Sequence, residues 1–357
     1  MGEPAAAAAA TEPELDPWHA WLNPKPETPL FIASAWGRVR EVRKLLAGGV
    51  DIEETSGMSR ASPAWIAAHV GHVEVLKLLL AAGADVSATD WNAATPLHGA
   101  AQNFQESEVE DPAQVELNKA AAAKLLLAAG AEVSAKDNYG RSPLTHASGA
   151  GYAGLVLLLL QHGADVSAEL PDSGDTPLHH ACAGIPNPRV VQLLLAHGAD
   201  LSAVDTRQRY TPLHNAAGRG IQDGEDAGPH LERMRLLLEG GADPSAKTME
   251  GQTPLHIAAA TYHLEPDVVL LLLRHGADPS AKGEYGSSPL HLVAHRGPSL
   301  PTHGLQAAFR ALLDAGANIS AQNNGGWAPE DLARARSHHE LVAMLRAEPT
   351  RRCPTSY

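Results

Sequence analysis

The chain has 357 residues and a formal net charge of −14 at pH 7; 44% of its residues are hydrophobic and only 4% are aromatic. This apolar content excludes a disordered chain, and the acidic balance argues against a nucleic-acid partner, because nucleic-acid affinity rests largely on cationic contacts to phosphate. Two cysteines, Cys182 and Cys353, are too few for a disulfide scaffold or a four-cysteine zinc site.

The first 27 residues are rich in proline and alanine, a composition typical of disordered segments. No basic stretch precedes an apolar one here, so we expect no secretory signal. Trp18 and Trp21 share helical spacing and could fold back as a cap over the segment that follows.

No part of the chain has the length of apolar sequence that a membrane helix needs. The longest aliphatic run, Leu155 to Leu160, is far shorter than the roughly 20 residues of a membrane span. We therefore expect an intracellular protein, cytoplasmic, nuclear or both, without membrane insertion.

From residue 28 to residue 345 an internal repeat dominates the sequence. A Thr-Pro or Ser-Pro pair recurs eight times, and a ninth, degenerate copy is Ala328-Pro329. Each full copy continues through a leucine cluster to Gly-Ala-Asp or a close variant, as in Leu193 to Asp200. The eight pairs begin at Thr28, Ser62, Thr95, Ser142, Thr176, Thr211, Thr253 and Ser288.

Each copy predicts two short helices and a turn. Thr or Ser is a favourable N-cap, and proline is favourable at the first helical position. A second helix carries apolar residues at spacings of three and four, as from Val73 to Leu80. The glycine after it predicts a left-handed C-cap, and the polar residues that follow, such as Val133 to Arg141, predict a projecting finger.

The motif Thr-Pro-Leu-His stands at 95–98, 176–179, 211–214 and 253–256, with a near match at 288–291. With this motif the segment 28–345 strongly resembles the ankyrin repeat. The resemblance implies an all-α solenoid of about eight full repeats plus a degenerate C-terminal cap from Ala328 to Leu345, with hairpin-like fingers. It also implies that the motif histidines link fingers and helices by hydrogen bonds. We expect residues 346–357 to form a disordered tail.

Three repeats are expanded between their two helices, near residues 104–117, 221–230 and 297–304. We expect these insertions at the edge of the solenoid opposite the fingers. The first is acidic, from Gln105 to Glu116, and the second adds Asp223, Glu225 and Asp226. Either they are solvated loops or they form a negative edge for a basic partner. Neither has the spacing of an EF-hand calcium loop.

The sequence predicts no enzyme and no cofactor. A G-x-S-x-G nucleophile motif, a phosphate-binding Walker loop and a dinucleotide fingerprint between strand and helix do not occur. Among the 19 histidines, His338-His339 is a weak metal candidate. Cys182 replaces a packed alanine and predicts a buried small residue.

Aromatic and arginine residues outside the predicted core are the candidate binding residues, because both types are common interface anchors. The alternative is that they pack one finger against the next. The candidates for partner binding are Trp36, Trp91, Tyr139, Arg141, Arg209, Tyr210, Arg219, Tyr262, Tyr285, Arg296 and Trp327.

These features predict a monomeric, non-enzymatic module that binds one or more partner proteins on the concave face made by fingers and first helices. Such a module acts as a scaffold, an inhibitor or a targeting subunit. The alternative is a substrate-recognition adaptor of a ubiquitin ligase. Neither end of the chain has room for a ligase-recruiting box, which counts against the adaptor.

Overall fold

The computed structural model describes residues 28–57, 59–103, 111–219, 226–296 and 304–347. Within these ranges the chain forms 18 α-helices, one 3-10 turn (Glu284–Gly286) and no β-strand. The expected Trp18/Trp21 cap, the tail after residue 347 and the central parts of the three insertions lie outside the described residues.

The described helices form nine successive pairs, each with a first and a second helix. They are α1 (Pro29–Ala35) and α2 (Val39–Ala47); α3 (Pro63–Val70) and α4 (Val73–Ala81); α5 (Pro96–Ala101) and α6 (Pro112–Ala128); α7 (Pro143–Ala150) and α8 (Ala153–Gln161); α9 (Pro177–Ala183) and α10 (Pro188–Ala196); α11 (Pro212–Gly218) and α12 (Ala227–Glu239); α13 (Pro254–Ala260) and α14 (Pro266–Arg274); α15 (Pro289–Ala294) and α16 (Leu305–Asp314); α17 (Pro329–Ala335) and α18 (His339–Arg346).

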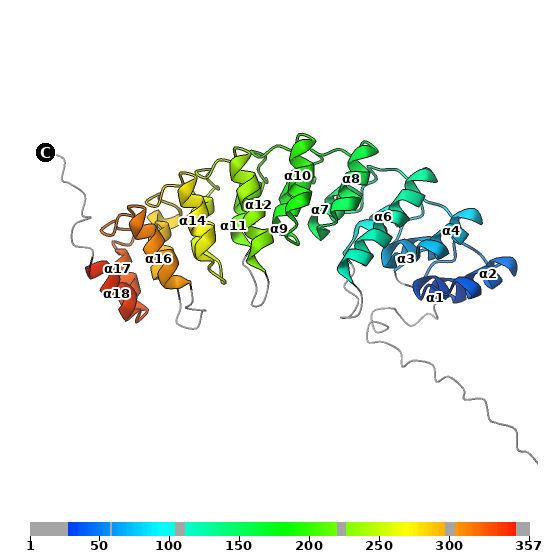
Figure 1. Ribbon diagram of the computed structural model, residues 1–357, viewed down its shortest axis with the longest axis horizontal. Coiled ribbons are helices and arrows are strands. Elements are labelled where there is room, and N and C mark those ends of the chain that lie inside the picture. Colours follow the sequence, from blue (N-terminus) through cyan, green and yellow to red (C-terminus); the bar gives the residue numbers. More distant parts are fainter. Residues whose placement is uncertain (1–27, 58, 104–110, 220–225, 297–303, 348–357) are drawn as a thin grey trace, which may run out of the picture.

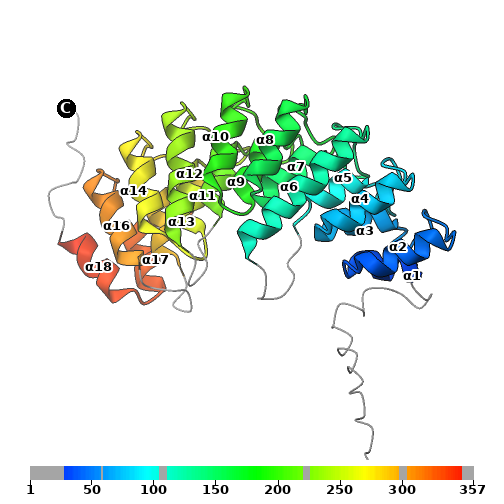
Figure 2. The same ribbon diagram turned by 45° about the vertical axis from the view of Figure 1, so that its right-hand side comes forward.

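The pairs follow one another in a single curved row, with α1 and α2 at one end and α17 and α18 at the other (Figures 1 and 2). This arrangement confirms the all-α repeat solenoid. A single pair cannot bury its apolar face alone, so each pair depends on its neighbours.

The predicted caps form as the sequence indicates. The Ser62 hydroxyl accepts from the backbone N–H of Trp65 (3.1 Å), and the Ser142 hydroxyl accepts from that of Thr145 (3.2 Å). Proline fills the first helical position in both helices. At the other end of α7, Gly151 adopts φ +76°, a left-handed conformation that glycine reaches without a steric penalty.

Leucine, valine and alanine layers form one continuous core along the stack. Leu194 on α10 and Leu272 on α14 are fully buried, as their spacing predicts. Thin layers of aliphatic side chains need few aromatic residues, which accounts for the composition.

Two insertions are partly helical, which differs from the expectation of loops. Helix α6 has 17 residues and α12 has 13, against nine in α8. The cause is an early cap: the Asp111 carboxylate accepts from the N–H of Ala113 (3.1 Å) and Pro112 begins the helix. The added amino-terminal turns of α6 and α12 lie at the edge away from the loops that follow the second helices (Figures 1 and 2).

The described fingers are compact turns rather than β-hairpins. One finger is closed by a hydrogen bond from Asp137 N–H to the Arg141 carbonyl (3.0 Å). Single backbone hydrogen bonds join several neighbouring fingers, as from Asn138 N–H to the Asn92 carbonyl (2.9 Å). These bonds tie successive fingers together along much of the stack.

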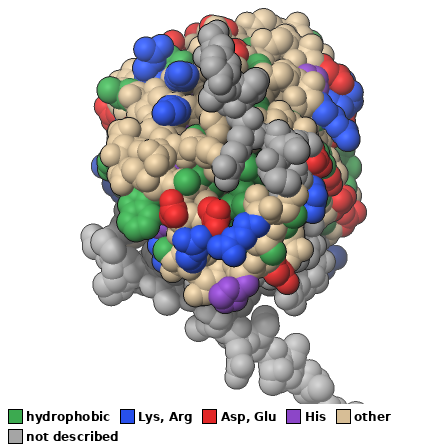
Figure 3. All heavy atoms as spheres, turned by 90° about the vertical axis from the view of Figure 1, so that its left-hand side faces the viewer, with side chains coloured by type: hydrophobic (Ala, Val, Ile, Leu, Met, Phe, Trp, Pro, Cys, Tyr) green, Lys and Arg blue, Asp and Glu red, His purple; other side chains and the backbone are tan. Residues whose placement is uncertain are grey.

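The last pair, α17 and α18, carries charged residues on its outer side. Arg334 and Arg346 both pair with the Glu330 carboxylate, at 2.6 and 3.0 Å. Seen from this end, acidic and basic side chains lie side by side (Figure 3). Such a surface suits a terminal repeat, which has no further neighbour to cover it.

Candidate interaction surface

A repeated histidine ties each of five first helices to the finger that leads into the next pair. Its Nδ1 accepts from the backbone N–H of the capping Thr or Ser, which leaves the proton on Nε2. Nε2 then donates to a finger carbonyl oxygen. The links are His98 to Arg141 (3.0 Å), His179 to Tyr210 (3.1 Å), His214 to Gln252 (3.2 Å), His256 to Ser287 (3.1 Å) and His291 to Trp327 (3.1 Å).

Burial lowers the pKa of His98 and of His214 to about 4, so these two rings are neutral near neutral pH. Their single ring proton is therefore fixed on Nε2. The motif histidines position the fingers, in agreement with the role that the resemblance implied.

A second set of contacts closes the carboxyl-terminal ends of the first helices, where carbonyl groups have no partner inside the helix. A donor from the next pair reaches these oxygens. His72 Nε2 bonds the Ala35 carbonyl (2.9 Å), and the Asn187 amide donates to that of Gly151 (2.7 Å).

In the three expanded repeats this donor is a buried cation. Lys119 Nζ donates to the His69 carbonyl at the end of α3 (2.5 Å) and also to the Gln102 carbonyl of its own pair (2.8 Å). The Arg233 guanidinium donates to the Ala181 carbonyl (3.1 Å). Burial lowers the pKa of Lys119 to about 7. Cations are favourable at a helix carboxyl terminus because they oppose its negative dipole end.

Arg296 is the third buried cation, and this corrects the expectation that it offers a surface anchor. Its side chain is only 5% exposed, and its guanidinium donates to the carbonyls of Ala259, Thr261 and Tyr262. The guanidinium bonds the carbonyl groups at the carboxyl end of α13, so it is not available to a partner.

The structure divides the remaining predicted anchors into two rows. Trp36 and Arg219 are the C-cap residues of α1 and α11, and Tyr262 follows α13 closely. They lie at the carboxyl ends of first helices, whereas the fingers join the amino ends. The second row, which we name the finger row, consists of Trp91, Tyr139, Arg141, Arg209, Tyr210, Tyr285 and Trp327.

Four aromatic residues of the finger row are exposed and form two neighbouring pairs. Trp91 (59% exposed) and Tyr139 lie on adjacent fingers, joined by the Asn138 amide, which donates to the Trp91 carbonyl (3.3 Å). Tyr285 (72% exposed) and Trp327 lie on two later adjacent fingers. Tyr210, half-buried and stacked on His214 at 5.4 Å, lies between the two pairs in chain order.

Arg141 is held beside Tyr139 by a buried carboxylate. Its guanidinium lies 4.7 Å from the ring centroid of Tyr139, and its Nε donates to Asp137 (2.9 Å). His146 bonds the same oxygen (3.1 Å). Although burial raises the pKa of Asp137, the hydrogen bonds from His146 and Arg141 lower it well below its usual range. The finger therefore presents an ordered aromatic-cation pair.

Models of ankyrin repeats match residues 30–110, 113–205 and 186–283, and a model of the single ankyrin repeat matches residues 285–324. The chain belongs to the ankyrin repeat family. Ankyrin repeats are generally protein-protein interaction modules, and ankyrin repeat proteins are typically non-enzymatic. No curated protein matches the chain. No helix among the described residues has both the length and the apolar character needed to span a membrane.

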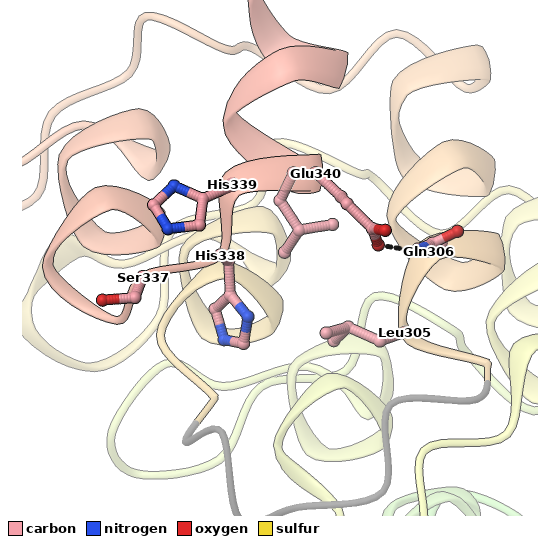
Figure 4. A pocket seen from close by; sticks show the side chains of 7 residues that line it. Leu305, Gln306, Ser337, His338, His339 and Glu340 are labelled. Atoms are coloured by element: carbon pink, nitrogen blue, oxygen red, sulfur yellow. Dashed lines mark hydrogen bonds between the residues drawn. The ribbon is translucent and has the colours of Figure 1, made fainter.

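The histidine pair of the last ankyrin unit does not come together as a metal site. A pocket of about 360 Å³ between α16 and α18 is lined by Leu305, Ser337, His338 and His339, among others. The two rings point in different directions (Figure 4), and His338 Nε2 bonds the Arg296 carbonyl. Within the part of the chain that the structure describes, no group of three or more His, Cys, Asp or Glu residues could hold a metal ion.

Cys182 is fully buried in α9 of the ankyrin stack. Burial raises the pKa of its thiol to about 12. Because the thiolate is the reactive form, this cysteine is a packing residue, as predicted.

Proposed function

We propose that this ankyrin repeat chain is a non-enzymatic module that binds an extended segment of a partner protein along the finger row and the adjoining first helices. The observation that carries the proposal is the exposure of Trp91, Tyr139, Tyr285 and Trp327 on four fingers. These rings fill no core, and large aromatic residues are the usual anchors of protein interfaces.

The rigidity of the finger edge supports the same function. Five of the described fingers are held by a histidine link, and the finger that contains Arg141 is also joined to the preceding finger by a backbone hydrogen bond. Binding to a preorganised surface costs little ordering entropy, so more of the contact energy appears as affinity. We propose a monomer inside the cell that acts as a scaffold, an inhibitor or a targeting subunit.

The test is copurification of the full chain from cells, identification of the retained proteins, and affinity measurement with each purified candidate. Trp91→Ala and Tyr285→Ala should each weaken a true partner, and loss of an interface anchor typically costs about 2 kcal/mol or more, roughly thirtyfold in affinity. Leu117→Ala is the matched control, because Leu117 is 63% exposed but lies on the second helix α6.

Two results would contradict the proposal. Normal binding by both aromatic variants, with loss in the Leu117 variant, would place the site on the edge that carries the first insertion. Recovery of ubiquitin-ligase subunits that bind independently of the fingers would favour a ligase adaptor.

A further inference from the structure

One finger position has a left-handed backbone in all eight units in which the structure describes it. It lies two residues before the residue that caps the next first helix. Glycine fills it in five units, namely Gly140, Gly174, Gly251, Gly286 and Gly326, with φ from 69° to 76°. The other three units have Arg60 (φ 50°), Ala93 (φ 58°) and Arg209 (φ 60°).

An arginine at this position is unfavourable for the fold. A residue with a Cβ atom pays a steric cost in the left-handed region that glycine does not pay. Strained backbone of this kind concentrates at sites where the side chain serves a function. The side chain of Arg209 is exposed, and it forms no hydrogen bond or ion pair within the part of the chain that the structure describes.

Arg209 lines a groove between two neighbouring fingers. The groove has a volume of about 560 Å³; Leu201, Val204 and Arg209 line it from one finger, and Lys247 lines it from the next. Val204 is 39% exposed, so its side chain offers apolar surface to a ligand in the groove. Lys247 is exposed and has no ion-pair partner among the described residues. Two cationic and two apolar side chains therefore line the same groove.

We propose that this groove receives an acidic side chain of the partner segment, with its carboxylate on Arg209 and Lys247 and an adjacent apolar residue on Leu201 and Val204. The proposal rests on the proposed function of the finger row and names the chemistry of its central part. An arginine guanidinium binds a carboxylate through paired, charge-assisted hydrogen bonds.

The lining of the groove also includes two carboxylates of the protein itself, and these favour a partner carboxylate over a partner phosphate. Asp200 and Asp243 also line it, and each accepts a backbone N–H of its own turn, from Ser202 and Ser245 (both 2.8 Å). Like charges repel a doubly charged phosphate more strongly than a singly charged carboxylate. The chain's net charge of −14 disfavours nucleic acid for the same reason.

The probe is a displayed library of random linear peptides, selected on the full chain. We expect the retained peptides to share an Asp or Glu beside an apolar residue. Arg209→Gly should weaken their binding about tenfold or more, the effect of losing one charge-assisted hydrogen bond. Lys247→Gln should weaken it less, and added salt should reduce the difference between variants and wild type.

Arg60→Gly is the matched control, because it makes the same change at the same backbone position of a distant finger. Both glycine variants should be at least as thermally stable as the wild type, since both remove strain. A less stable Arg209→Gly protein would show that the side chain supports the fold, and would overturn the proposal.

Other outcomes separate this proposal from the proposed function. Peptides that depend on Trp91 and Tyr285 but bind Arg209→Gly normally overturn the groove and leave the finger row in place. Peptides that require phosphorylation overturn the choice of a carboxylate. Peptides that tolerate every finger substitution, or a library that yields none, contradict both proposals.

Discussion

Gly184 lies directly against the backbone of Gly149, across the contact between α9 and α7. A Cβ atom at Gly184 would overlap the carbonyl oxygen of Gly149. The same oxygen accepts a hydrogen bond from the N–H of Ile185 (3.0 Å). The contact brings the ends of two first helices together. It leaves no room for a side chain at Gly184, whereas Gly149 has room for one.

Gly184→Ala should destabilise the protein, whereas Gly149→Ala should stabilise it. The first change forces two backbones apart, and overpacking of this kind typically costs about 1–3 kcal/mol. The second adds a methyl group whose nearest neighbours are at 3.8 Å, and alanine inside a helix is roughly 0.5–1 kcal/mol better than glycine. Urea titration of both variants measures the difference, and equal midpoints would show that the backbones are not in contact.

Arg233→Met should lose about 2–4 kcal/mol, because it keeps much of the buried volume but removes the donors to several groups. The guanidinium serves the Ala181 carbonyl (3.1 Å) and His230 Nδ1 (3.0 Å), and the side chain is fully buried. Arg235→Met is the control on the same helix. Arg235 pairs with Glu232 and Glu239 at the surface, where ion pairs contribute little. Similar losses in the two variants, measured by denaturant titration, would argue against a capping role for Arg233.

The fold could be predicted from the sequence because its signals are local. Ser142 and Pro143 are adjacent, and Gly151 ends the same helix. The early start of α6 was missed although Asp111-Pro112 is the same kind of signal, because the acidic run before it indicated a loop. The Asp-Pro pair indicates a helix start, but the acidic composition of the insertion favoured a loop.

The buried cations could not be predicted, because their partners are distant in the sequence. Arg233 and the Ala181 carbonyl are 52 positions apart, and Lys119 and the His69 carbonyl are 50 apart. Nothing near Arg296 distinguishes it from an exposed arginine, so its type alone suggested an interface residue. The types of residue on the candidate surface could therefore be predicted from the sequence. Which of these residues are exposed depends on how successive repeats pack, and this could not be predicted.

Leu194→Ala should cost about 2–5 kcal/mol, the usual range for a fully buried leucine. The side chain lies in α10, in the middle of the stack, where neighbouring pairs cover it on both sides. Chemical denaturation should show one transition at lower denaturant for this variant. A loss below about 0.5 kcal/mol would mean that the leucine layers do not carry the stability expected of a core.

Stability should fall as the pH is lowered from 6.5 toward about 4, the interval between the ordinary histidine pKa and the lowered values of His98 and His214. In this interval the unfolded chain binds protons at these residues and the folded chain does not, so protons favour unfolding. Burial also lowers the pKa of His180 to about 4, which adds to the same effect. Urea titrations across the interval should give a free energy of unfolding that rises with pH. His98→Gln should reduce this slope. A slope of zero, or one that is equal in the wild type and the variant, would show that the finger links tolerate protonation and would contradict the neutral Nε2–H donors assigned here.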